Sequence, residues 1–74
     1  MKKIEILKII CKINGQETVA VPATKKELVK IKSKKRECGE QFCCETYIWV
    51  MLEDGNGDCY PFKTEVRCNV DECK

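Results

Sequence analysis

Apolar and polar residues alternate on both sides of Asn14-Gly15, and this pattern predicts a β-hairpin near the start of the chain. The stretch 4–13 holds five isoleucines, and β-branched side chains favour strands. The same isoleucines also fit a helical period, but Asn-Gly supplies the two positive φ angles of a tight two-residue turn. Residues 16–21 alternate again and end at Pro22. We therefore expect residues 4–13 to pair with residues 16–21.

A second hairpin is expected in the C-terminal half of the chain. Residues 46–52 are mostly aromatic or β-branched, and they precede a polar turn with two glycines over residues 53–58. Residues 59–68 then alternate once more. Pro61 has no N–H to donate to a sheet, so we expect it at an edge or at a bulge.

The segment between the two hairpins, residues 24–35, fits two structures. Thr24 and Glu27 match a capping box, and a short helix would then follow with Leu28 and Ile31 facing inward. The alternation of apolar residues with lysines over the same segment predicts instead a strand with one lysine face. We expect the strand and keep the helix as the alternative.

These elements predict a mostly β fold, or an α+β fold if the short helix forms. The expected architecture is a small curved antiparallel sheet or partly open barrel, built from two β-hairpins with one extra strand or short helix between them. A chain of 74 residues forms a single small domain, residues 1–74. No apolar run approaches the roughly 18 residues of a membrane-spanning helix, so no membrane association is expected.

Cysteine is the residue type that changes this picture most, because the chain has seven cysteines and no histidine. The spacing C-x4-C occurs twice, at Cys38 and Cys43 and again at Cys68 and Cys73. If the second hairpin folds at the centre of its turn, Cys43 faces Cys68 and Cys38 faces Cys73. Facing residues lie close enough for disulfides 43–68 and 38–73. A turn one residue longer would place Cys44 opposite Cys68 instead.

Zinc is the alternative use of the same four thiols, Cys38, Cys43, Cys68 and Cys73, if they are reduced; otherwise we expect no cofactor. The further disulfide candidates are Cys11, Cys44 and Cys59. Either Cys44 or Cys59 could meet Cys11, and one cysteine must be left over because seven is odd. The leftover thiol is either buried or bonded to a second chain, so we expect a monomer or a disulfide-linked dimer.

Charge is divided unevenly along the chain. Residues 1–36 carry eleven Lys/Arg and three Glu, whereas residues 37–74 carry three Lys/Arg and nine Asp/Glu. The basic stretch 30–36 suits phosphate contacts, with aromatic side chains as stacking platforms for bases. The candidates for nucleic-acid binding are Lys30, Lys32, Lys34, Lys35, Arg36, Tyr47 and Trp49. The other interpretation is that the lysines form a solvated face and that the aromatic residues fill the core.

The source of the chain is indicated only by composition. High Lys and Glu with low Asn and Gln are typical of hyperthermophiles, whose intracellular proteins keep disulfides. Lys2 and Lys3 resemble the start of a secretion signal, but no cleavage site follows them. The protein is therefore either secreted with its signal removed or intracellular in a thermophile.

The absence of histidine removes the Ser-His-Asp and Cys-His classes of catalysis, and we expect no enzyme. Our first functional hypothesis is a non-catalytic, small cysteine-rich interaction module that binds another protein. The alternative is a small nucleic-acid-binding β-domain that uses residues 30–36. The third hypothesis is a thiol redox protein.

Overall fold

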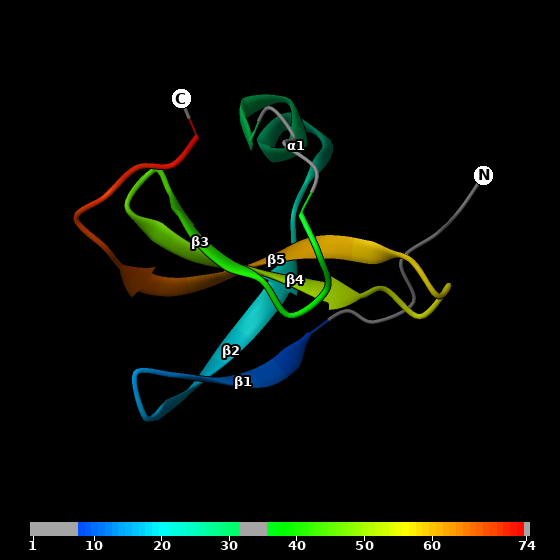
Figure 1. Cartoon of the computed structure of the whole chain (residues 1–74), viewed down its shortest axis with the longest axis horizontal. Coiled ribbons are helices and arrows are strands. Elements are labelled where there is room, and N and C mark those ends of the chain that lie inside the picture. Colours follow the sequence, from blue (N-terminus) through cyan, green and yellow to red (C-terminus); the bar gives the residue numbers. More distant parts are fainter. Residues whose placement is uncertain (1–7, 32–35, 74) are drawn as a thin grey trace.

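The computed structural model describes residues 8–31 and 36–73 and is mostly β (Figure 1). Five strands form one open antiparallel sheet in the order β1-β2-β5-β4-β3. One short helix lies between the second and third strands in the chain. The elements are β1 (Ile9–Ile13), β2 (Gln16–Pro22), α1 (Lys25–Ile31), β3 (Gln41–Cys44), β4 (Tyr47–Glu53) and β5 (Cys59–Arg67).

The first hairpin, β1 with β2, confirms the prediction made from the Asn-Gly turn. Asn14 and Gly15 have φ angles of 52° and 79°, and Ile13 lies opposite Gln16. Such a turn matches the twist of the two strands that it joins. Residues 4–7 of the expected first strand lie outside the described residues.

The segment after β2 forms the helix α1, so the expected strand over residues 24–35 is wrong for Lys25–Ile31; residues 32–35 lie outside the described ranges. The capping box decides the outcome: the N–H of Thr24 donates to Glu27 Oε1 (2.9 Å), and the N–H of Glu27 donates to Thr24 Oγ1 (3.2 Å). Ile31 is buried, as expected for the helix.

Within the described ranges, no helix has the length and apolar character needed to cross a membrane.

A tight turn at Glu45 and Thr46 joins β3 to β4, and the sequence pattern missed it. Both residues have positive φ angles, 54° and 67°, which is uncommon for residues other than glycine. Without a glycine or a proline to mark the turn, residues 43–52 resemble one continuous strand. The chain instead reverses here, so Cys43 lies on a separate strand, at the edge of the sheet.

The second hairpin, β4 with β5, has a register one residue away from the expected one and contains an irregularity. Glu53 lies opposite Cys59 and Trp49 opposite Lys63, but the register shifts between Trp49 and Tyr47. Thr64 lies beside this shift and is buried, and its hydroxyl donates to the C=O of Ile48 (3.2 Å). This bond supplies a donor to a β4 carbonyl at the point where the strand ladder is irregular.

Two clusters of buried apolar side chains lie on opposite faces of the sheet. The helix α1 covers the face that carries the first cluster: Ala23, Ile31, Phe42, Cys44 and Trp49. On the other face, Ile13 of β1 packs with Ile48 and Val50 of β4. Strands β2 and β5 lie between β1 and β4 in the sheet, so this contact requires the sheet to curl. The expected curved antiparallel sheet is confirmed.

Candidate functional site

Six of the seven cysteines form disulfides, and all six lie within residues 38–73, which we call the stapled part. The bonds close loops with sequence separations of 21, 25 and 29 residues. In the chain-entropy model each stabilises the fold by about 3–4 kcal/mol. The pairs are Cys38–Cys59, Cys43–Cys68 and Cys44–Cys73.

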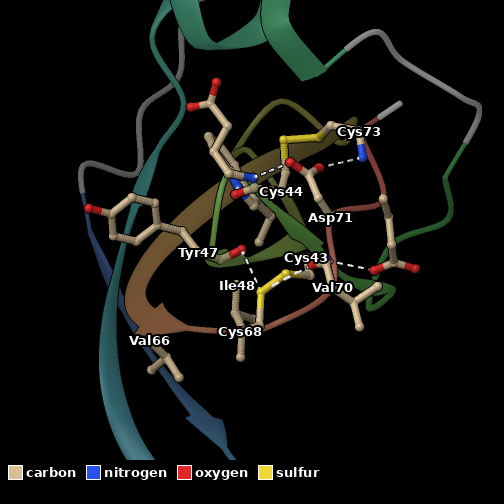
Figure 2. The surroundings of a disulfide bond; sticks show 12 residues. Cys43, Cys44, Tyr47, Ile48, Val66, Cys68, Val70, Asp71 and Cys73 are labelled. Atoms are coloured by element: carbon tan, nitrogen blue, oxygen red, sulfur yellow. Dashed lines mark hydrogen bonds between the residues drawn. A yellow bond between two sulfur atoms is a disulfide. The ribbon is translucent and has the colours of Figure 1, made fainter.

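The adjacent cysteines of β3 bond to partners on opposite faces of the sheet. Successive side chains of a strand point to opposite faces, so Cys43 and Cys44 face away from each other. Cys44 and its partner Cys73 belong to the cluster under α1, whereas Cys68 packs with the cluster on the other face. Figure 2 shows the two disulfides leaving neighbouring residues in different directions.

The chain between Cys68 and Cys73 therefore wraps around the edge of the sheet at β3. Glu72 joins the tail to that edge twice: its N–H donates to the C=O of Cys43 (2.7 Å), and its Oε2 accepts from the N–H of Cys43 (2.6 Å). Asp71 accepts from the N–H of Cys73 (2.9 Å), and this bond shapes the end of the tail (Figure 2). The outer edge of β3 is thus covered by a covalently fixed segment.

The expected pairing 43–68 is confirmed, but the expected pairing 38–73 is wrong. The prediction placed all four cysteines on one two-stranded hairpin, whereas the turn at Glu45 puts Cys43 on a third strand. Cys38 bonds instead to Cys59. The expected pairing of Cys11 with Cys44 or Cys59 is also wrong, because both of those cysteines have partners within the stapled part.

The four thiols predicted as zinc ligands belong to three different disulfides in this structure. Zinc binds thiolates, and the structure has none to offer at Cys38, Cys43, Cys68 or Cys73. The zinc alternative stays a prediction for a reduced chain.

Cys11 is the free cysteine, and it lies half-buried on β1. Burial raises the pKa of its thiol, which lowers the fraction of nucleophilic thiolate at neutral pH. Its C=O accepts from the hydroxyl of Thr18 on the neighbouring strand (3.5 Å).

Two cations of the basic stretch are described, and both contact other side chains. Lys30 lies 3.6 Å from the carboxylate of Glu45, and the Arg36 guanidinium lies 3.8 Å from the centre of the Phe42 ring. Both contacts attach the segment around α1 to β3 and its turn. The remaining candidates, Lys32, Lys34 and Lys35, lie outside the described residues.

The two aromatic candidates for base stacking differ in exposure, because Trp49 is buried and Tyr47 is partly exposed. Trp49 is 1% exposed, and its ring N–H donates to the C=O of Cys44 (2.9 Å), so its predicted role as a stacking platform is wrong. Tyr47 is half-buried, and the ammonium of Lys63 lies 5.5 Å from its ring centre.

Lys63 also pairs with Glu27 of α1. Burial raises the pKa of Glu27, but hydrogen bonds with Lys63 and Thr24 outweigh it, and the net effect lowers that pKa.

The first hairpin presents an apolar surface that we call the apolar strip: Ile10, Val19 and Val21. These side chains are 70%, 53% and 42% exposed, and Ile10 lies directly opposite Val19 in the register. Residues two apart on a strand share a face, so Val21 continues the strip toward β5.

A groove adjoins the strip where β2 leaves β5. Pairing of these two strands ends at Ala20 opposite Thr64, although both strands continue beyond that point. Figure 1 shows the first hairpin running away from the end of β5. The groove has a volume of about 610 Å³, and it is lined by Thr18, Val19, Val21, Lys63, Glu65 and Val66.

The sequence prediction did not identify the strip or the groove. A signal existed: Val19, Ala20 and Val21 are consecutive, and alternating strand residues cannot all face the core. Comparisons with protein families, curated proteins and solved structures give no match to this chain.

Proposed function

We propose that this chain is a non-catalytic interaction module that binds another protein. The observation that carries the proposal is the apolar strip, Ile10, Val19 and Val21, exposed on the one hairpin without a disulfide. Contiguous exposed apolar surface, more than single exposed residues, marks a contact with another molecule. The stapled part supplies a rigid support for that surface.

The other two hypotheses have less support. A nucleic-acid site at residues 30–36 would need stacking platforms, and Trp49 is buried. A thiol redox role by the free thiol would need a thiolate, and burial of Cys11 disfavours one.

The experiment uses the full chain as immobilised bait in a nuclease-treated extract of the cells that make it. Ile10→Ser with Val19→Ser removes two of the three apolar side chains of the strip, whereas Val29→Ser removes an apolar side chain on α1 that is 77% exposed. We expect a protein retained by the wild type and by the α1 control, and reduced about tenfold or more by the strip variant. Circular dichroism checks that all three chains are folded.

Two outcomes would overturn the proposal. Retention of the same proteins by all three baits would mean that the strip contributes nothing to recognition. A partner lost on nuclease treatment, with binding that falls steeply with salt, would select the nucleic-acid hypothesis.

A further inference from the structure

The two edges of the sheet differ in whether another segment of the chain covers them, and this difference points to how a partner docks. The outer edge of β3 is covered by the tail through Glu72. Among residues 8–31 and 36–73, no segment pairs with the outer edge of β1. An uncovered strand edge is a template for one more strand from another molecule.

The register of the first hairpin fixes which backbone groups face outward. In a two-residue hairpin the pair that flanks the turn is hydrogen-bonded, and the two kinds of pair alternate along the ladder. Ile13 and Cys11 thus direct their backbone polar groups toward β2, and the bond from Thr18 to the Cys11 carbonyl agrees with this. The N–H and C=O groups of Ile10 and Lys12 then point to the open edge.

The side chains at this edge specify the charge of the occupant. Lys8, Ile10 and Lys12 lie two residues apart, so they share a face, and all three are exposed. A strand added here would place its own side chains directly opposite them, about 4.5–5.5 Å away between Cβ atoms. Glu17 lies opposite Lys12 on the neighbouring strand β2, away from the open edge. The side chains of β1 that face an added strand therefore carry positive charge.

A second copy of the chain fits this edge poorly. Antiparallel pairing of two β1 strands centred on Ile10 places Lys8 opposite Lys12, and like charges at facing positions are destabilising. Pairing centred on Cys11 places Lys12 opposite Ile10, which gains no charge attraction. The lysines thus disfavour self-association and favour an acidic partner.

We propose that the outer edge of β1 binds an extended segment of another protein in which two acidic residues lie two positions before and two positions after an apolar one, so that all three share a face. The segment adds a sixth strand to the sheet, its backbone bonds to Ile10 and Lys12, its acidic side chains face Lys8 and Lys12, and an apolar one packs on Ile10. This inference rests on the proposed function and names the class of partner and the edge that it uses.

The test uses the full oxidised chain and two blocked peptides of about seven residues. One peptide carries Glu, Val and Glu at its second, fourth and sixth positions with Thr elsewhere, and the other carries Lys, Val and Lys at those three positions. Lys8→Glu with Lys12→Glu reverses the edge charge, whereas Lys25→Glu with Lys26→Glu makes the same change on exposed residues of α1. Fluorescence anisotropy gives the Kd, and amide hydrogen exchange by NMR reports the backbone contact.

We expect the Glu peptide to bind the wild type and the α1 control, and to bind the edge variant about tenfold more weakly or worse. The edge variant gains affinity for the Lys peptide. Binding slows amide exchange at Ile10 and Lys12 and leaves Cys11 unchanged, because the Cys11 N–H already faces β2.

Several results would overturn the inference. They are no binding of the Glu peptide, equal binding of both peptides, equal loss in the α1 control, or binding without protection of the Ile10 and Lys12 amides. Concentration-dependent self-association in sedimentation would assign the edge to a second copy. If the extract partner is lost from the strip variant but kept by the edge variant, the proposed function stands and this inference fails. If no partner is found in the extract, the proposed function fails even where the peptide binds.

Discussion

The stapled part and the first hairpin belong to one sheet, but different interactions hold them. Three disulfides cross-link residues 38–73, whereas the first hairpin is joined to that part by three β2–β5 pairs and by the packing of Ile13. A small domain buries too little apolar surface to stabilise every element equally. Covalent cross-links in one part allow apolar side chains in the other to face solvent.

The largest test of this comparison is reduction of all three disulfides. Each bond contributes about 3–4 kcal/mol, so their loss is on the order of 10 kcal/mol, which is comparable with the whole stability of a small domain. We expect the reduced chain to unfold in both parts. Circular dichroism and tryptophan fluorescence with and without a reductant check this, and a reduced chain that keeps Trp49 buried would contradict it.

The disulfide between Cys44 and Cys73, which fixes the tail to β3, should make the next largest contribution to the free energy of unfolding. Replacing Cys44 and Cys73 together by alanine should lower the free energy of unfolding by about 3–4 kcal/mol. The released tail should also speed amide exchange at Cys43, which bonds to Glu72, without changing exchange in β1. Urea unfolding and hydrogen exchange measure the two effects. Equal acceleration in β1 would show that the two parts do not open separately.

Thr64 lies at the point where β2 leaves β5, so it tests the junction between the two parts. Thr64→Val keeps the shape of the side chain but leaves the C=O of Ile48 without this donor, at a cost of about 1–3 kcal/mol. Urea unfolding gives the value. An unchanged midpoint would mean that the hydroxyl does not hold the irregular ladder.

Glu27 links α1 to the stapled part through Lys63 and caps the helix at Thr24. Glu27→Gln should cost about 0.5–1 kcal/mol at neutral pH. The folded-state pKa of Glu27 is lowered, so its contribution is present above the unfolded pKa and is lost as the pH falls through the folded value. The difference between wild type and variant should therefore shrink in acid. A difference that is constant with pH would contradict the role of the charge.

Cys11 should show the smallest effect. Cys11→Ala removes a half-buried thiol with no covalent partner in the structure, and we expect a change of about 1 kcal/mol or less. Alkylation of the wild-type thiol should be slow at neutral pH because its pKa is raised. Rapid alkylation at neutral pH would restore the redox hypothesis for this residue.

The parts of the fold that depend on short-range signals could be predicted from the sequence. Asn14-Gly15 determines the first turn because few residues adopt two consecutive positive φ angles. The capping box at Thr24 is also a short-range signal: its hydrogen bonds decide for the helix over the strand that the lysine alternation predicts, and the burial of Ile31 adds to this preference. The positive φ angles at Glu45 and Thr46 carry no such signal.

The cysteine pairing depends on that missing turn. Once β3 forms a separate edge strand, the alternation of faces sends Cys43 and Cys44 to different partners. A pattern based on one hairpin could identify the pair 43–68 but not the partner of Cys38. The candidate docking edge escaped the prediction for a related reason, because exposure depends on which strands pair and which do not.

The wrapped tail also determines how the molecule responds to pulling. Force applied at Cys73 passes through the disulfide with Cys44 into β3, so the tail does not peel from this edge of the sheet unless the disulfide is reduced. Force applied at Ile9 meets only hydrogen bonds, which break one after another as β1 peels from β2. An attachment point that must bear mechanical load therefore belongs near Cys73, whereas an attachment near Ile9 lets β1 separate from β2 at low force.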